Sequence, residues 1–198
     1  MNLGDLKFIY FLSCIGLGLI ILSPTLISVV QLGKGEMFSE LWILGQDHEL
    51  ANYPSNVTPG DNYQIYLGVS NNMGSLKHYK IYVKFRNQTE ALPNLTTGIP
   101  SSLEPLCEFQ TFIKNDETWE GSLTFSFSNI SFSENRSSVK NIVLNNHVLE
   151  VNKKAQWDTK NRGYYYQLFF ELWLHDSNSN DFVFSNRFAA LWLKMTTT

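Results

Sequence analysis

The residues that could bind a metal or carry out catalysis are scattered along this chain. There are four histidines, and no two of them are separated by two or four positions: His48, His78, His147 and His175. Such short spacings are what place two histidines side by side on one strand or helix in a metal motif. Residues 47–49 (Asp-His-Glu) could contact a metal ion, but a solvated loop is the expected state of this charged run.

Carboxylates and cysteines give no stronger indication of chemistry. Asp176 and Asp181 lie in an Asn/Ser-rich stretch that could bind calcium weakly, although a hairpin turn explains it better. Four further carboxylates lack the paired spacing of a general acid and base: Glu104, Glu108, Glu120 and Glu171. Cys107 could be a nucleophile only beside a base, which its sequence neighbours do not provide, so a small buried strand residue is expected.

Sequence motifs for phosphate, zinc, redox or serine-hydrolase chemistry are also absent. The chain contains no Gly-rich phosphate loop, CxxC, HExxH or GxSxG. We therefore expect a protein that is not an enzyme, with no catalytic residues, no metal ligands and no cofactor.

The element that must position any site is an apolar segment near the N-terminus. Phe8 to Val30 contains 23 residues and no charge. As a helix it would be about 34 Å long, enough to cross a hydrocarbon core of about 30 Å. A cleaved signal peptide is the alternative, but its apolar region usually has only about 7–15 residues before an A-x-A-like site. We predict one uncleaved transmembrane helix, with the lipid bilayer as its partner.

The orientation follows from size and glycosylation signals, because the flanking charges nearly cancel. All five Asn-x-Ser/Thr sequons lie after the apolar segment: Asn56, Asn87, Asn94, Asn129 and Asn135. Acceptor asparagines must be exposed outside the cytoplasm. We expect a single-pass protein of the cell membrane with a cytoplasmic N-terminus and an extracellular, glycosylated C-terminal domain.

Composition limits the class of the C-terminal part. Residues 1–32 form the tail and helix, and residues 33–198 are long enough for one domain with its own core. The 15 basic and 18 acidic side chains give a net charge of −3, so we expect no nucleic-acid partner. Cys14 lies in the predicted helix and Cys107 in the domain, so no disulfide between them is expected.

Alternating apolar and polar residues predict an all-β domain. The plainest case is residues 79–86, where Tyr79, Ile81, Val83 and Phe85 should face the core and the intervening side chains water. Seven further strand-like runs are expected: residues 37–45, 61–70, 106–114, 118–127, 141–151 (a hairpin with Asn145-Asn146 at its turn), 164–174 and 182–195. Residues 87–105 and 152–163 are expected to be loops, and residues 129–138 a polar stretch between strands. The predicted fold is an antiparallel, immunoglobulin-like β-sandwich of about eight strands after one transmembrane helix.

The opening of this domain resembles a known family. The stretches that carry the resemblance are FSELWILG (38–45), NYP (52–54), NVTPG (56–60), YLGVSN (66–71) and ETW (117–119) leading into LTF (123–125). They are similar to the DUF1616 family of uncharacterised archaeal membrane proteins. The resemblance implies an envelope-associated protein with its β domain outside, and it supplies no catalytic residues. Many members have several membrane helices, whereas one is predicted here.

Two functions are compatible with these features. The first is a non-catalytic cell-surface protein whose β domain binds another envelope protein or serves as an accessory subunit of a membrane complex. The alternative is a module that binds carbohydrate or a surface polymer, because the chain has 14 Phe, 9 Tyr and 5 Trp residues. An exposed row of Trp or Tyr rings would favour the alternative, and Trp42, Trp157 and Trp173 are the rings to inspect.

Overall fold

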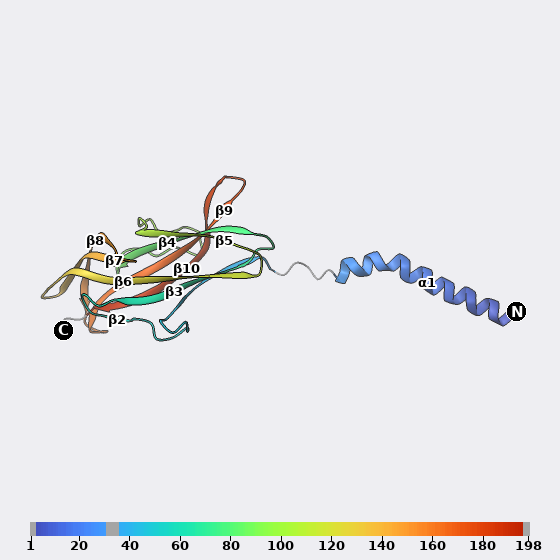
Figure 1. Cartoon of the computed structure of the whole chain (residues 1–198), viewed down its shortest axis with the longest axis horizontal. Coiled ribbons are helices and arrows are strands. Elements are labelled where there is room, and N and C mark those ends of the chain that lie inside the picture. The colour runs from blue at the N-terminus through green and yellow to red at the C-terminus, as the bar shows by residue number, and fades with distance from the viewer. Residues whose placement is uncertain (1–2, 31–35, 196–198) are drawn as a thin grey trace. The chain divides into compact units, whose positions relative to one another are not determined.

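The computed structural model describes residues 3–30 and 36–195, with the side chains of Leu3, Asp5 and residues 22–30 left undescribed. The chain forms two compact units, Met1–Met37 and Phe38–Thr198. The first contains one helix and the second contains every strand (Figure 1).

The helix α1 comprises Leu3–Val30. It therefore begins five residues before the predicted span and ends at the same residue. Its described apolar side chains are mostly exposed, among them Phe8, Tyr10 and Phe11. Among the residues described, no helix is long and apolar enough to cross a membrane. The side chains from residue 22 to the end of the predicted span lie outside the described part.

Residues 36–195 contain ten strands and no helix. The strands are β1 (Phe38–Leu44), β2 (Asn56–Val57), β3 (Tyr63–Asn72), β4 (Lys77–Asn87), β5 (Cys107–Ile113), β6 (Glu117–Ser133), β7 (Arg136–Leu144), β8 (His147–Asp158), β9 (Gly163–Asp176) and β10 (Asp181–Met195). They form one continuous sheet in the order β1-β3-β6-β7-β8-β9-β10-β2, with β4 beside β9 and β5 beside β4. All neighbours are antiparallel except β2 and β10.

The sheet is curled so that its two halves face each other (Figure 1). The link between the halves is β8, which pairs along its length with β7 but with β9 only at Trp157 and Asp158. Across the interior, the rings of Phe85 and Phe127 lie 5.5 Å apart. The halves are therefore a first half (β1, β3, β6, β7, β8) and a second half (β5, β4, β9, β10, β2) around one core.

The core is made by the alternating residues of facing strands, which confirms the predicted pattern. In β4 the side chains of Tyr79, Ile81, Val83 and Phe85 are all at most 2% exposed. Buried tyrosine hydroxyls are satisfied across the core, because Tyr79 pairs with Ser39 at 2.7 Å. The hydroxyls of Tyr166 and Ser137 form an equivalent pair at 2.7 Å.

Two stretches that were not predicted to be strands, the polar residues 129–138 and the expected loop 152–163, lie largely or partly in strands. β6 continues to Ser133 and β7 begins at Arg136, so residues 129–138 are mostly paired. β8 likewise continues to Asp158, through the expected loop 152–163. Serine, asparagine and lysine on the solvent face hid an alternating inner face, which includes Ile130 and Phe132. The predicted hairpin turn is confirmed, since Asn145 and Asn146 have φ values of 46° and 68°.

Candidate interaction surface

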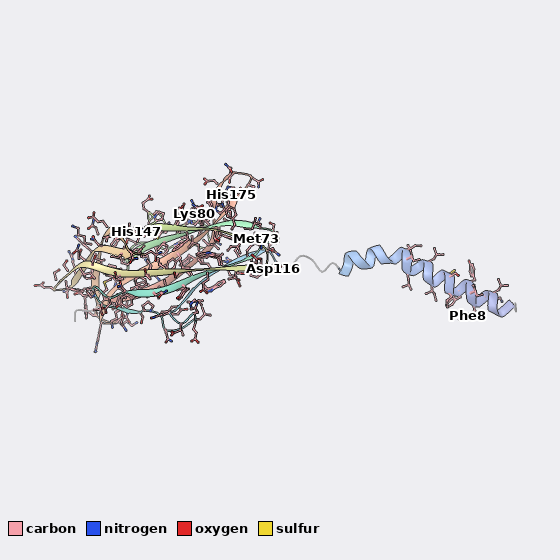
Figure 2. All side chains as sticks on the ribbon, viewed as in Figure 1. Phe8, Met73, Lys80, Asp116, His147 and His175 are labelled. Carbon is pink, nitrogen blue, oxygen red and sulfur yellow. The ribbon has the colours of Figure 1, made fainter. Side chains whose placement is uncertain are left out.

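Four rings form a row across the outer face of the second half, the face turned away from the core. Strand register places Phe112 of β5 opposite His78 of β4, and His175 of β9 opposite Phe182 of β10. The rings of His78 and His175 are 5.9 Å apart, which joins the two pairs. We call Phe112, His78, His175 and Phe182 the aromatic row; Figure 2 labels His175 within it. It lies at the end of the sheet where β4 and β10 begin and β5 and β9 end.

The rings of the aromatic row contact one another closely. His78 stacks on Phe112 with centroids 4.1 Å apart and planes 16° from parallel. Phe182 meets both histidines edge-on, at 4.9 Å from His78 and 5.4 Å from His175. Phe112 is nevertheless 68% exposed, and the other three rings are half-buried. The row is therefore a set of closely packed rings that is most open to solvent at Phe112.

A second set of rings continues this surface along the strands. Tyr82 meets Trp173 edge-on at 5.3 Å, and Trp173 lies 5.8 Å from Phe184. All three side chains are half-buried. The ammonium of Lys80 lies 4.4 Å from the ring centroid of Phe182, a cation–π geometry.

A polar chain of contacts borders the aromatic row on β4 and β5. Lys80 pairs with Glu108 at 3.3 Å, and the Gln110 amide donates to Glu108 at 2.6 Å. The other side of the Gln110 amide, Oε1, lies 3.2 Å from Nε2 of His78. Burial alone would lower the pKa of Lys80, but the contacts with Glu108 and Tyr82 together outweigh that effect and raise the pKa.

Farther along the same face, a buried ion pair fastens the long loop 88–106 to the sheet. Lys84 and Glu171 lie 2.9 Å apart, and their side chains are 4% and 0% exposed. The Ser101 backbone binds both charges, because its N–H donates to Glu171 at 2.7 Å and its carbonyl accepts from Lys84 at 2.8 Å. The expectation that this face of β4 lies in water is therefore wrong for its second part.

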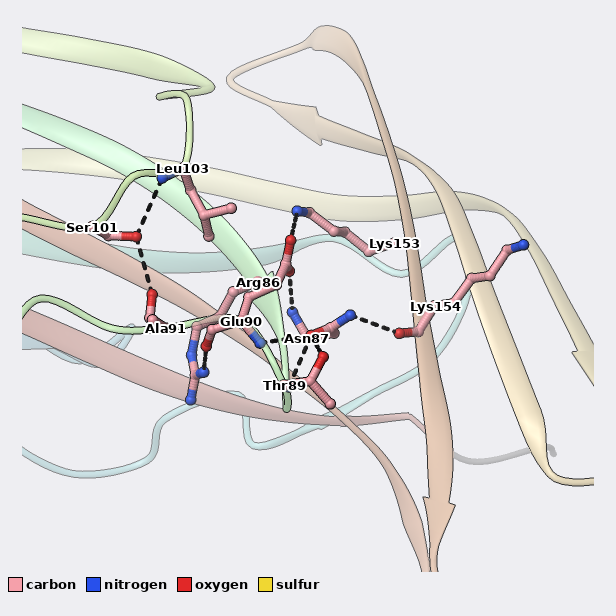
Figure 3. Close-up of polar contacts among 9 residues, drawn as sticks. All are labelled: Arg86, Asn87, Thr89, Glu90, Ala91, Ser101, Leu103, Lys153 and Lys154. Atoms are coloured by element: carbon pink, nitrogen blue, oxygen red, sulfur yellow. Dashed lines mark hydrogen bonds and ion pairs between the residues drawn. The ribbon is translucent and has the colours of Figure 1, made fainter.

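The start of the loop is held by a second group of contacts, drawn in Figure 3. Arg86 donates to the Glu90 carbonyl, and its Nε donates to Gln167 at 2.7 Å. The Glu90 carboxylate in turn pairs with Lys153 of β8. Burial lowers the pKa of Arg86, and the nearby charge of Glu90 opposes that effect. Phe169 of β9 is fully buried as well, although it is not part of the core cluster.

Two further candidate residues, His48 and Asp176, have structural contacts. His48 stacks on Tyr66 at 3.7 Å and pairs with Glu120 at 2.6 Å, so its loop is docked on the first half. Asp176 accepts backbone hydrogen bonds from Asn178 and Ser179, which lower its pKa and form the expected hairpin turn. Within the described residues, no group of three or more His, Cys, Asp or Glu side chains could hold a metal ion.

Cys107 lies at the start of β5, in a pocket of about 470 Å³ that His147 also lines. Apolar side chains make most of the remaining wall: Leu106, Phe109, Leu144 and Leu149. Burial raises the pKa of the Cys107 thiol to about 11, with a further contribution from Glu108. At neutral pH the thiol is protonated and therefore a weak nucleophile. Neither Cys107 nor Cys14 is in a disulfide.

Four of the five sequon asparagines are exposed: Asn56, Asn94, Asn129 and Asn135. Asn87 is half-buried at the end of β4, and its amide donates to the Lys154 carbonyl at 3.0 Å. Its side-chain oxygen also accepts from the backbone of Thr89 and Glu90. Asn87 is thus the least available acceptor of the set.

The tryptophans do not form a row. Trp42, Trp157 and Trp173 are half-buried, while Trp192, which the sequence did not single out, is 46% exposed. The Trp42 indole lies against Gly68, where a Cβ would fall 2.1 Å from Cε2. Beside it is an open pocket of about 560 Å³ that Glu40, Leu44, Leu50 and Arg187 help to line.

Sequence reasoning missed the aromatic row because its members come from four different strands. His78 and His175 are 97 positions apart (175 − 78), and only the pairing of β4 with β9 brings them together. Periodicity does place both outside the core, at the polar positions of their strands. The missing information was therefore the strand order and register.

Comparison with known proteins identifies a family but no function. The model of the family described as "Domain of unknown function (DUF1616)" matches residues 32–140, more than half of the chain. No curated protein matches the sequence.

Likenesses to solved structures are weak. One is a chain of the human seminal-plasma complex of Zinc 2-glycoprotein and Prolactin inducible protein, with 9% identity, a TM-score of 0.39, and coverage of 84% of this chain and 100% of that one. Another is β-glucosidase from Listeria innocua, with 9% identity and a TM-score of 0.38 over 80% of this chain and 16% of that one. A PapD-like domain of human CEP192 has 7% identity and a TM-score of 0.32, over 80% and 84% of the two chains. TM-scores this low support no conclusion.

The buried ion pair predicts an asymmetric response to mutation. Lys84→Met leaves the Glu171 carboxylate buried without its cation, which should lower the free energy of unfolding by about 3–5 kcal/mol. Lys84→Met with Glu171→Leu should recover most of that loss, because no unpaired charge is left. Urea denaturation followed by tryptophan fluorescence measures this, since all five tryptophans lie in the second unit.

Lys114→Met is the matched control. It removes an exposed ion pair with Glu117 at 3.2 Å and should cost at most about 1 kcal/mol. Equal losses for Lys84→Met and Lys114→Met would show that the buried pair does not hold the loop.

Proposed function

This chain belongs to the DUF1616 family, and we propose that it is a membrane-anchored, non-catalytic protein whose β domain binds another envelope or membrane protein. The observation that carries the proposal is the aromatic row, where Phe112 is 68% exposed beside three ordered rings. Aromatic side chains are enriched at the centres of protein interfaces, where they contribute much of the binding energy.

The proposed anchor is the predicted span from Phe8 to Val30. Its support is the absence of charge over 23 residues and the exposure of Phe8, Tyr10 and Phe11 on α1. In water such exposed apolar side chains are unfavourable, whereas lipid satisfies them. We place the N-terminus in the cytoplasm and residues 33–198 outside the cell, as one domain, because the sequons all lie there.

For the domain we propose an immunoglobulin-like β-sandwich. The order β1-β3-β6 corresponds to strands A, B and E of that architecture, and β4-β9-β10 to strands C, F and G. β5 then extends the second half beyond strand C. The hairpin of β7 and β8 is an addition that leads from one half into the other.

The edge strand β5 supports a role in protein interaction. Among the described strands β5 pairs with β4 alone, so its other edge is open along most of its length, with Asn71 bound to the Ile113 carbonyl at its end. Phe112 projects from this strand into the aromatic row. A partner bound here would cover an apolar surface and could also extend the sheet.

Absence of catalysis is part of the proposal. Its support is the protonated Cys107 thiol, whose raised pKa opposes nucleophilic attack, and the use of Glu171 in an internal ion pair. The Cys107 thiol and the Glu171 carboxylate therefore have structural roles, and neither is activated for a reaction.

The membrane location can be tested in intact cells of the host. The full-length protein should remain in the membrane after carbonate washing, because an apolar helix is not released by disrupting electrostatic contacts. External protease should digest the β domain, and at least one exposed sequon should carry glycan if the host glycosylates. A mature N-terminus near Gly33 would identify a secreted protein instead, and a protected, unglycosylated domain would reverse the orientation.

The interaction is tested by capturing the full-length protein from native membranes under mild detergent. We expect a specific co-purifying membrane or envelope protein that is lost with Phe112→Asp. The control is Val148→Asp, which adds the same charge at a 63% exposed position on β8 and should not change capture. Recovery of only the monomer, or equal capture by both variants, would contradict the proposal.

A second candidate, binding of carbohydrate or surface polymer, is favoured by one observation. The Trp42 ring, Glu40 and Arg187 line the same open pocket, so an aromatic ring stands beside groups that can bind hydroxyls. Trp42→Ala should then abolish binding to polysaccharide extracted from the host envelope, measured by calorimetry. Trp192→Ala, at the 46% exposed tryptophan, is the control. No binding by the wild type would exclude this candidate.

A further inference from the structure

His78 and His175 lie side by side on the outer face of the second half. They come from the adjacent strands β4 and β9, with ring centroids 5.9 Å apart and planes 28° from parallel. A zinc ion bound tetrahedrally to two imidazole nitrogens would hold the ring centroids about 5 Å apart. Both side chains are half-buried, so a shift of about 1 Å at the open surface would bring them to that separation.

The polar chain beside the row sets the tautomer of His78. The Gln110 amide nitrogen donates to the Glu108 carboxylate at 2.6 Å, so Oε1 is the Gln110 atom that faces His78. Because that oxygen can only accept, Nε2 of His78 must carry the hydrogen of the 3.2 Å contact. In the neutral ring, Nδ1 then has a free lone pair. Metal-binding histidines are oriented in this way, by a carbonyl that accepts from the other ring nitrogen.

The neighbouring rings and charges are compatible with a bound cation. Phe112 stacks on His78 and Phe182 meets both imidazoles, which limits the conformations that binding would have to select. Two lysines of β4 lie close in sequence to His78: Lys77 precedes it directly, and Lys80 has its charge paired with Glu108. Asp176 and Asp181, at the ends of β9 and β10, add negative charge beside His175.

We propose that His78 and His175 form a two-histidine site for a borderline divalent transition metal such as Zn²⁺. Imidazole nitrogen suits Zn²⁺, Ni²⁺ and Cu²⁺, whereas Mg²⁺ and Ca²⁺ prefer oxygen ligands. Water completes the coordination, since no third protein ligand stands with the pair among the described residues. The bound ion would join β4 to β9 at the open end of the second half. The site shares His78 and His175 with the aromatic row, but metal binding requires only the chain's own residues and is therefore measured without a partner protein.

The test is calorimetric titration of Zn²⁺ into the purified full-length protein, without a histidine tag and after removal of metals with a chelator. We expect one Zn²⁺ per chain at pH 7.5 and no binding of Mg²⁺. His78→Gln and His175→Gln should each weaken Zn²⁺ binding by at least about 10-fold, and Gln110→Ala by about 10-fold through the lost orientation of His78. His147→Gln is the matched control, because His147 is exposed on β8, apart from the row (Figure 2).

A second measurement separates metal binding from loss of folding. Zn²⁺ should raise the thermal unfolding midpoint of the wild type and of His147→Gln but not of His78→Gln, while circular dichroism shows the same β structure in all three. Unchanged Zn²⁺ affinity in His78→Gln/His175→Gln would overturn the proposal, as would no binding by the wild type. Loss of binding in Cys107→Ser or His147→Gln would also overturn it, because the ion would then occupy the pocket at the start of β5.

Discussion

The burial of β4 and β9 on both faces is the constraint on which the rest of the domain depends. One face of each strand packs into the core, and the other is covered by loop 88–106 along part of its length. That cover requires Lys84 and Glu171 to be desolvated together, which is tolerable only because each charge is paired and bound to the Ser101 backbone. If either charge is removed, the loop loses the ion pair that holds it on the sheet.

The extent of the covering loop determines where the candidate surface lies. Its contacts reach Lys84, Arg86 and, through the Leu95 carbonyl, Asn186 of β10, but not the beginning of β4. The first residues of β4 therefore keep their outer side chains accessible, and their register neighbours are aromatic. A single sheet face is thus divided into a buried, charge-paired part and an open, ring-lined part. A partner or ligand can reach only the second.

Sequence periodicity predicted the β class and the inner face of β4, because alternation directly reports which side of a strand is buried. It could not predict the covering loop, because the sequence pattern is the same for a lysine buried by a distant segment and for a lysine in water. Lys80 and Lys84 both lie at outward positions of β4, yet only Lys84 is fully enclosed. It also extended the loops too far, because Ser and Asn on the exposed face of β6 resemble turn residues. The DUF1616 motifs identified the family, which the match over residues 32–140 confirms.

The position of His78 shows how the open part of this face depends on the edge strand β5. Lys80, the next outward residue on β4, pairs with Glu108, which holds Gln110 and so fixes the hydrogen on His78. Each of these contacts crosses from β4 to β5 or follows β5, so the orientation of one imidazole depends on the pairing of an edge strand. An edge strand is also where a sheet can be extended by a partner. Four side chains therefore couple the orientation of the His78 ring on the open surface to the pairing of β5 with β4. The two are not separate features of the domain.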